Sequence, residues 1–396
     1  MHIKKLHYEL MRPPKYKIVF CTPAIYSAGG VERAVSCKAN YFADVFGYDV
    51  TIIVTEGKDD ATFFSLSREV KIVNLGLDFE ELWHKPFWKK ILLYLKKQYR
   101  YKNALRKELM NIRPDIVVST LRREVNFINN IKDGSLKIGE LHLSRGNYRG
   151  TETSATNIVK YLFFKWWKGD VVNIIRQFDR FVVLTESAAE EWPELKNITV
   201  IPDPLTLNVT DKSNRDAKRV IAVGRYSYEK GYDMLLHIWS IVEKRCIDWQ
   251  LDVYGMGDPT PYVKMMTELS IDMSRCHLNA SLADVSKEYV RSSILVQPSR
   301  FESFGLVVVE AMAFGLPVVA FDCENGPRTI LSDGVEGFLI PAFDEEMFAE
   351  RIIDLANNKQ KRVQMGEAGR IQSDRYHIDK IAILWKQLFD ELMTGR

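Results

Sequence analysis

The hydrophobic positions of this chain fall into short apolar runs that alternate with longer segments of helical spacing. In the first half, the apolar runs have the length and composition of buried strands, and they lie at 17–21, 49–54, 115–119, 137–142, 180–185 and 197–201. Residues 31–46 carry apolar side chains at the spacing of a helix. Short apolar strands that alternate with helices predict a parallel sheet wrapped by helices.

The same pattern restarts after a stiff, polar connection. A Pro-Asp-Pro link at 202–204 is followed by polar residues over 211–219. Beyond it, strands are predicted at 219–223, 249–254, 275–278, 294–297, 316–321 and 338–340, with helices at 233–246, 261–270, 286–292 and 378–393. We therefore predict two Rossmann-like domains and a final helix, over 1–205, 206–375 and 376–396.

Composition places the chain among globular proteins with two cores. Its 396 residues are 46% hydrophobic and 27% charged, which is ordinary for such a protein. The net charge of +3 is unevenly divided: residues 1–205 hold 32 Lys and Arg against 24 Asp and Glu, and the remainder holds 23 against 28. A basic first half beside an acidic second half favours an anionic partner for the first half.

The cysteines and the chain start bear on location. Five scattered cysteines without CxxC spacing fit a reducing compartment and argue against a structural zinc. The first ten residues are mixed and charged, unlike a signal peptide, and no apolar run approaches the roughly 20 residues that span a bilayer. We expect a cytoplasmic protein, with peripheral contact to the inner face of the cytoplasmic membrane as an open alternative.

The stretch 300–317 carries two carboxylates eight residues apart, Glu302 and Glu310. An apolar run lies between them, and Gly315 and Pro317 follow where a helix should end. Glu302 should therefore lie in a loop, and Glu310 inside an apolar helix, where a carboxylate is costly without a partner. Ribose and sugar hydroxyls are such partners. The alternatives are a buried ion pair for Glu310 and a helix-start carboxylate for Glu302.

This segment resembles the donor-site signature of retaining glycosyltransferases with the GT-B fold, in the large family 4 (glycosyl transferases group 1). That family carries a Glu, seven residues and a second Glu around Phe-Gly, and Glu302, Phe304, Gly305 and Glu310 match it. With the matches below, the resemblance extends from about Ile18 to the C-terminus. It implies an α/β protein of GT-B architecture: an acceptor-binding and a nucleotide-sugar-binding domain face each other across a cleft, and the C-terminal helix crosses back to the first domain.

The resemblance assigns roles within this segment. Glu310 is expected to accept hydrogen bonds from the ribose of the nucleotide, and Glu302 to lie near the transferred sugar. The backbone amides of Phe304, Gly305 and Leu306 open the helix and can donate to oxygens of the donor.

Two cations follow the first strand of the second half. Arg225 and Lys230 could neutralise the charge that develops on a diphosphate leaving group without a metal. Their spacing, Gly-Arg, four residues, Lys-Gly, matches the family motif. The alternative is a pair of solvated surface cations.

Two glycine-containing loops are further candidates. Gly29 and Gly30 open the first helix, where backbone can approach a diphosphate closely, and with Arg33 they match a family loop. Gly255 and Gly257 follow a strand and are weaker candidates for donor contacts. In both loops the alternative is an ordinary turn.

His142 ends a strand expected to face the cleft. A lone histidine is more often structural, but the family places a His at the end of a comparable strand, near the donor sugar, so His142 is a candidate catalytic residue. Arg145, three residues on, is a candidate for an anionic acceptor.

Basic and aromatic residues gather at 81–107 and 161–168. Phe87, Ile91 and Leu95 recur at helical spacing among nine Lys and Arg residues, which is typical of a helix that binds a membrane surface. The alternative is that both stripes face the core and the cations reach outward. Basic and aromatic composition could also suggest nucleic acid, but it is not an expected partner of a chain that carries this donor-site set.

Together these features predict a retaining, metal-independent glycosyltransferase of the hexosyltransferase type, without a cofactor. It would move a sugar from a nucleotide diphosphate, most simply a uridine one, to a hydroxyl of a glycan or lipid-linked glycan in surface polysaccharide biosynthesis. Two alternatives stay open: a non-catalytic nucleotide-sugar or glycan-binding protein, and a GT-B enzyme of another class, such as a nucleotide-sugar epimerase. A phosphorylase would need a pyridoxal-phosphate lysine, for which no motif is present.

Overall fold

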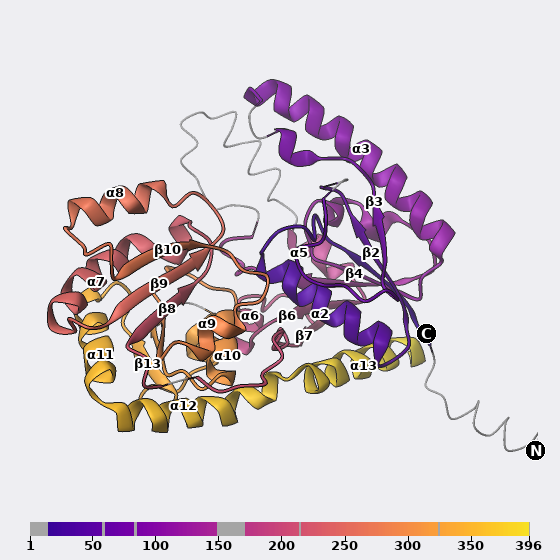
Figure 1. Ribbon diagram of the computed structural model, residues 1–396. Coiled ribbons are helices and arrows are strands. Elements are labelled where there is room, and N and C mark those ends of the chain that lie inside the picture. The colour runs from indigo at the N-terminus through magenta and orange to yellow at the C-terminus, as the bar shows by residue number, and fades with distance from the viewer. Residues whose placement is uncertain are drawn as a thin grey trace, which may run out of the picture.

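The computed structural model describes residues 15–57, 60–82, 85–148, 171–213, 215–323 and 325–395. Two parallel sheets, each covered by helices, lie side by side, and the last helices run along one side of both halves (Figure 1). The first sheet has the strand order β3-β2-β1-β4-β5-β6-β7 and the second β10-β9-β8-β11-β12-β13. In both sheets the order reverses beside the first strand, at β1/β4 and at β8/β11, and ligands of open α/β sheets bind outside the carboxyl ends of strands at such points.

The first half contains seven strands within the described residues, all paired in parallel. They are β1 (Lys17–Cys21), β2 (Asp49–Val54), β3 (Lys71–Asn74), β4 (Ile116–Ser119), β5 (Leu136–Leu141), β6 (Arg180–Val183) and β7 (Ile198–Val200). The helices are α2 (Gly30–Asp44), α3 (Phe87–Ile112), α5 (Val171–Arg176) and α6 (Glu186–Glu190). Alternate residues of β1 enter two separate cores, Val19 and Cys21 in one and Ile18 and Phe20 in the other, so both faces of the sheet are buried.

The second half repeats the arrangement with a smaller sheet, again parallel throughout. Its strands are β8 (Arg219–Val223), β9 (Gln250–Gly255), β10 (Cys276–Ala280), β11 (Ile294–Gln297), β12 (Val318–Phe321) and β13 (Gly337–Ile340). Its helices are α7 (Tyr232–Arg245), α8 (Thr260–Glu268), α9 (Ser286–Val290), α10 (Leu306–Ala313), α11 (Glu345–Asn357) and α12 (Lys359–Ser373).

The C-terminal helix α13 (Ile378–Thr394) leaves the second half and packs on the first (Figure 1). Trp385 is fully buried in a core of the first half, and the ring of Phe389 meets that of Phe42 on α2 at 5.6 Å. The Tyr16 hydroxyl donates to Asp390 Oδ1 at 2.7 Å. The predicted crossing of this helix to the first half is confirmed.

Strand β3 was not predicted. Its sequence, Lys-Ile-Val-Asn, contains only two apolar residues, and it is partly exposed because it forms the edge of the sheet. An edge strand buries little surface, so its apolar signal is weak.

Helix α3 resolves the choice between core and surface for 81–107 in an unexpected way, because it carries two apolar stripes. The inner stripe, Tyr101, Leu105 and Leu109, is buried in the first half. The outer stripe is exposed by 52% or more at each position and consists of Trp88, Leu92, Leu95 and Tyr99. Of the three residues expected to form one stripe, Phe87 and Ile91 are instead half-buried.

The segment 161–168 lies outside the described residues. None of the helices within the described residues combines the length and apolar character needed to span a bilayer.

Candidate active site

The predicted residues lie at or after the carboxyl ends of strands in both sheets. Gly29 and Gly30 follow β1, and His142 directly follows β5. Arg225 comes two residues after β8, and Glu302 lies in the loop between β11 and α10. The parallel topology thus brings segments far apart in the sequence to the carboxyl edges of the two sheets.

Glu302 and Lys230 form the centre of the site in the second half. Glu302 Oε1 accepts hydrogen bonds from Lys230 Nζ at 2.6 Å, from Gln297 Nε2 at 2.8 Å and from Ser299 Oγ at 2.8 Å. Gly326 lies against this carboxylate, since a Cβ atom there would come within 2.6 Å of Glu302 Cβ. The pair is therefore held by three donors and a close backbone approach, which fixes its geometry.

Arg225 does not join this pair. Its guanidinium donates to Glu229 Oε1 at 2.8 Å, and its side chain is 55% exposed. Lys230 passes close to Gly224, the neighbour of Arg225, because a Cβ on Gly224 would lie 3.3 Å from Lys230 Cδ. The two cations are thus close along the backbone, but only Lys230 contacts Glu302.

Glu310 is fully buried on α10 and has three partners from distant segments. Its Oε1 accepts from Arg33 NH1 at 2.5 Å and from Thr206 Oγ1 at 2.8 Å, and its Oε2 accepts from the Tyr289 hydroxyl at 3.2 Å. Burial and Glu310 together raise the pKa of Tyr289 well above its ordinary value, so the phenol stays a donor. The ion pair considered as the alternative for Glu310 is present, and it joins the two halves. The ribose contact stays a prediction.

The start of α10 has the predicted form. Gly305 is the residue before the helix, and its φ of +96° lies in the region that side chains other than glycine rarely adopt. Phe304 is buried and meets the ring of Tyr376 at 5.5 Å, and Leu306 is the first helical residue. The free amides at this helix start are available as donors to an anionic or polar group.

In the two glycine loops, glycine is present for different structural reasons. Nothing lies within 4 Å of a Cβ added to Gly30, so this glycine leaves open space at the start of α2. A Cβ on Gly255 would come within 2.2 Å of the Gly224 carbonyl oxygen. Gly255 therefore has a packing reason to be glycine, independent of any ligand.

His142 and Arg145 both have partners within the protein. His142 is buried, with Nδ1 3.2 Å from Asp203 Oδ2 and Nε2 3.4 Å from Glu140 Oε1. Arg145 makes two 2.9 Å hydrogen bonds to the Glu194 carboxylate and lies over the Trp192 ring at 4.6 Å. The acceptor contact expected for Arg145 would have to compete with Glu194.

Several residues of these clusters were not predicted as site residues. They are Lys38, Glu140, Asp203, Thr206, Tyr289, Gln297 and Ser299. For Glu140 a signal existed, because a carboxylate inside the apolar run 137–142 needs a partner just as Glu310 does. The others are ordinary polar residues in sequence and become notable only through their contacts.

One group of side chains among the described residues has the composition of a metal site. It comprises Glu140, His142 and Asp203, whose ligand atoms lie within 4.8 Å of one another. The buried ammonium of Lys38 donates to Glu140 Oε1 and already supplies a cation there. We therefore do not assign these residues as metal ligands.

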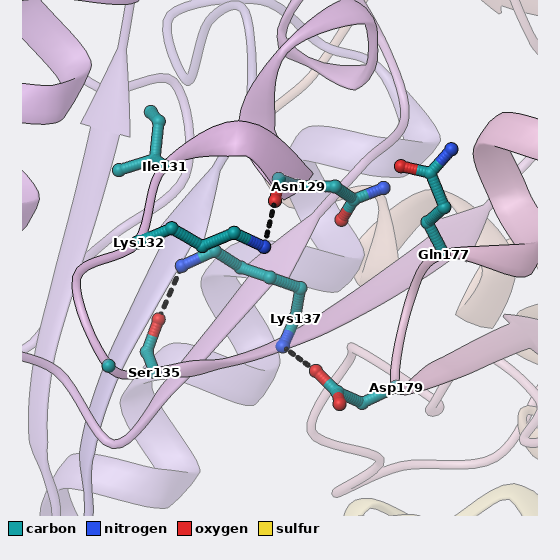
Figure 2. Close-up of a pocket in the computed structure, with 8 residues that line it drawn as sticks. Asn129, Ile131, Lys132, Ser135, Lys137, Gln177 and Asp179 are labelled. Carbon is teal, nitrogen blue, oxygen red and sulfur yellow. Dashed lines mark hydrogen bonds between the residues drawn. The ribbon is translucent and has the colours of Figure 1, made fainter.

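A separate cavity of about 400 Å³ lies near the amino end of β5, on the side of the first sheet away from the carboxyl ends of its strands (Figure 2). Some of its polar groups bond one another: Asp179 Oδ2 accepts from the Lys137 backbone amide at 2.7 Å, and Lys132 Nζ donates to the Asn129 carbonyl at 3.1 Å. Lys137 Nζ bonds Asp133 and Ser135 at 2.6 and 2.5 Å. None of the predicted site residues lines this cavity.

Comparison with solved structures establishes the fold class. Sucrose-phosphate synthase from Thermosynechococcus elongatus superposes with a TM-score of 0.79 at 18% identity, covering 96% of this chain and all of that one. TarM from S. aureus, in a complex with UDP, fondaparinux and α-GlcNAc-glycerol, gives a TM-score of 0.76 at 16% identity over 94% of this chain and 99% of that one. The predicted GT-B architecture is confirmed.

Sequence comparison points the same way. Residues 208–372 match the family model "Glycosyl transferases group 1". An uncharacterized glycosyltransferase of Haemophilus influenzae is 29% identical over 93% of this chain and 99% of its own length. The amylovoran biosynthesis glycosyltransferase AmsD of Erwinia amylovora is 25% identical over 95% of this chain and its full length. The chain is thus related along nearly its whole length to bacterial glycosyltransferases.

Proposed function

We propose that the protein is a retaining glycosyltransferase that moves a sugar from a uridine diphosphate sugar to a hydroxyl of a glycan or lipid-linked glycan. The observation that carries the proposal is the Lys230–Glu302 pair at the carboxyl edge of the second sheet, next to the helix that bears the buried Glu310. A cation beside a carboxylate suits a ligand that has both phosphate and hydroxyl groups. The relation to AmsD supports a role in surface polysaccharide assembly, and the UDP bound in the TarM crystal supports the choice of nucleotide.

In the proposed reaction, the bond between the anomeric carbon and the diphosphate breaks, and the acceptor oxygen bonds to the same face of that carbon. The acceptor proton passes to an oxygen of the leaving phosphate. Lys230 and Arg225 would stabilise the charge that develops on the diphosphate. Glu302 and the amides at the start of α10 would orient the sugar, and Glu310 would bind the ribose. In this proposal the reaction uses neither a metal nor an organic cofactor.

The direct test replaces Lys230 and Glu302 beside matched surface residues. Lys264 and Glu268 form an exposed pair on α8, 80% and 63% exposed. We expect Lys230→Ala and Glu302→Gln to lower kcat for glycosyl transfer by about 100-fold or more, as for loss of one preorganised charge-stabilising group. Lys264→Ala and Glu268→Gln should keep wild-type rates. Wild-type activity in both site variants would refute the assignment.

Product analysis separates the alternatives. Transfer that requires an acceptor supports the proposal, whereas conversion of the donor sugar without an acceptor indicates an epimerase. Saturable binding of a nucleotide sugar without any turnover indicates a binding protein. The donor is best found by thermal shift with a panel of nucleotide sugars, since a ligand at 100 times its Kd stabilises the folded state by about 2.7 kcal/mol.

We further propose that α3 brings the enzyme to an anionic membrane surface, where a lipid-linked acceptor would be found. Trp88, Leu92, Leu95 and Tyr99 are separated by four, three and four residues, so they follow one face of the helix. No Asp or Glu occurs from 85 to 107, while nine Lys and Arg residues do. Exposed apolar side chains within a strongly basic stretch of helix match the charge and depth of an anionic lipid interface.

Sedimentation with lipid vesicles tests this contact. The wild type should bind vesicles rich in phosphatidylglycerol and bind pure phosphatidylcholine vesicles at least tenfold more weakly. Trp88→Ser with Leu92→Ser should abolish binding, while Ile371→Ser on α12, which removes an equally exposed apolar residue (79%), should not. Equal binding of all variants, or of both vesicle types, would contradict the proposal.

A further inference from the structure

We propose that Asp203, in the link between the halves, is a positioning residue that keeps His142 as a doubly protonated imidazolium, so that His142 acts as a hydrogen-bond donor and never as a base. This inference rests on the proposed transferase function for its consequence in catalysis. The protonation state of His142 can be tested without measuring activity.

The surroundings of the His142 ring favour the doubly protonated form. The two ring nitrogens of His142 face two different carboxylates, Asp203 at 3.2 Å and Glu140 at 3.4 Å. A neutral imidazole has one donor and one acceptor nitrogen. In this arrangement the neutral form would therefore turn a lone pair toward a carboxylate oxygen inside the protein. Only the imidazolium presents an N–H to both.

The charges of the cluster balance in the same state. Lys38, on α2, is fully buried, donates to Glu140 and lies 4.9 Å from the Trp385 ring centre. Two carboxylates, one ammonium and one imidazolium sum to zero, whereas loss of the His142 proton would leave a buried net charge of −1, which is costly. Burial alone lowers the pKa of His142, but Asp203 and Glu140 outweigh it and raise that pKa to about 9.

A further titratable group near the cluster does not change this balance. Cys37 on α2 lies within electrostatic reach of Asp203, and burial raises the pKa of its thiol to about 12, so it stays neutral. The pKa of Glu140 would rise through burial alone, but Lys38 and His142 lower it to about 2, so this carboxylate stays charged.

The cluster is tied to the Glu310 cluster by shared elements. Helix α2 supplies Lys38 to Glu140 and Arg33 to Glu310, and the segment 203–206 supplies Asp203 to His142 and Thr206 to Glu310. The prolines on either side of Asp203 restrict the backbone and hold its carboxylate in place. One oxygen of Glu140 and one of Asp203 lack hydrogen-bond partners in this buried place, and Nε2 of His142, although 3.4 Å from the other oxygen of Glu140, makes no hydrogen bond to it. A hydroxyl, which both donates and accepts, matches this set of atoms.

Asp203→Asn tests the proposal because it keeps an acceptor for Nδ1–H but removes the charge. At about pH 6 the variant should transfer glycosyl groups within threefold of the wild type, since a histidine with its ordinary pKa near 6.5 is still largely protonated. At about pH 8 its kcat/KM should be roughly tenfold lower relative to wild type, because the alkaline limb of its pH–activity profile moves down by about two pH units. Asp379→Asn, at the exposed His377–Asp379 pair, is the matched control and should leave the profile unchanged.

Lys38→Met should shift the alkaline limb of the pH–activity profile in the direction opposite to that expected for Asp203→Asn. Without the ammonium, two carboxylates face one imidazolium, so the His142 proton is held more tightly and the alkaline limb should not move down. A uniform loss of activity at every pH in Asp203→Asn, with the limb unmoved, would reduce Asp203 to a structural role and overturn the proposal.

Nuclear magnetic resonance supplies a readout that does not depend on turnover. The ring signals of His142, assigned by their loss in His142→Gln among the seven histidines, should titrate above pH 8 in the wild type and below that in Asp203→Asn. A neutral His142 at pH 7 would overturn the proposal, as would a stoichiometric metal ion lost on Asp203→Asn. A confirmed titration in a protein without transferase activity would instead refute the proposed function alone.

Discussion

At the scale of single residues, the site is built from carboxylates whose partners come from other segments. Glu310 is the clearest example, because its carboxylate is fully buried and its cationic partner, Arg33, comes from the first half. The Thr206 and Tyr289 hydroxyls also donate to the Glu310 carboxylate, and these hydrogen bonds help to offset the cost of burying its charge. Removal of one partner would leave a buried charge uncompensated.

We expect Arg33→Met and Glu310→Gln each to lower the free energy of unfolding by about 3 kcal/mol, the usual cost of breaking a buried pair from one side. The double variant should lose clearly less than the sum, because neither charge is then left alone. Urea denaturation of the four proteins measures this coupling. Additive effects, or single losses below about 0.5 kcal/mol, would show that the pair is not energetically linked.

At the scale of elements, α3 shows how one helix serves two environments. Its inner stripe packs in the core of the first half and its outer stripe faces solvent. Each stripe follows from helical periodicity, but 26 residues with apolar side chains on two faces do not reveal which face is inside. The stripe expected at 87, 91 and 95 is found only in part, since Leu95 is exposed while Phe87 and Ile91 are half-buried. The packing of the helix on η1 (Phe79–Leu82) and on the sheet decided the inner face.

A stability comparison along α3 tests this assignment. Leu105→Ala should lower the free energy of unfolding by about 2–5 kcal/mol, since Leu105 is fully buried. Leu92→Ala makes the same chemical change on the same helix at a side chain that is 71% exposed, and should change stability by less than about 0.5 kcal/mol. Comparable losses in chemical denaturation would contradict the two-stripe description.

At the scale of the whole molecule, α13 and the α2 contacts hold the halves together. Trp385 belongs to the last helix of the chain yet fills a core formed by the first strands. In the second half, Asn325 reaches across to donate to Glu191. Among the predicted site residues, Glu310 pairs with Arg33 across the halves, and the Arg145 backbone amide donates to the same Glu191, so these parts of the site depend on the relative placement of the halves.

Trp385→Ala should therefore destabilise the first half although it lies in the C-terminal segment, by about 3–5 kcal/mol as for large core aromatics. Ile383→Ala on the same helix, at a 49% exposed position, is the control and should cost little. Hydrogen exchange resolved along the chain should show the loss of protection in β1 and α2. Loss confined to α13 itself would mean that the helix is only a surface attachment.

The sequence by itself determined the alternation of strands and helices, the restart of the pattern after the Pro-Asp-Pro link, and the placement of Glu302 before and Glu310 within an apolar helix. These features are local, because periodicity and helix-ending residues act within a few positions of one another. The tertiary structure alone decided that Arg33 pairs with Glu310 across 277 positions of sequence and Asp203 with His142 across 61, and which stripe of α3 is exposed. Such pairings depend on how distant segments meet in space, and local sequence patterns do not encode that.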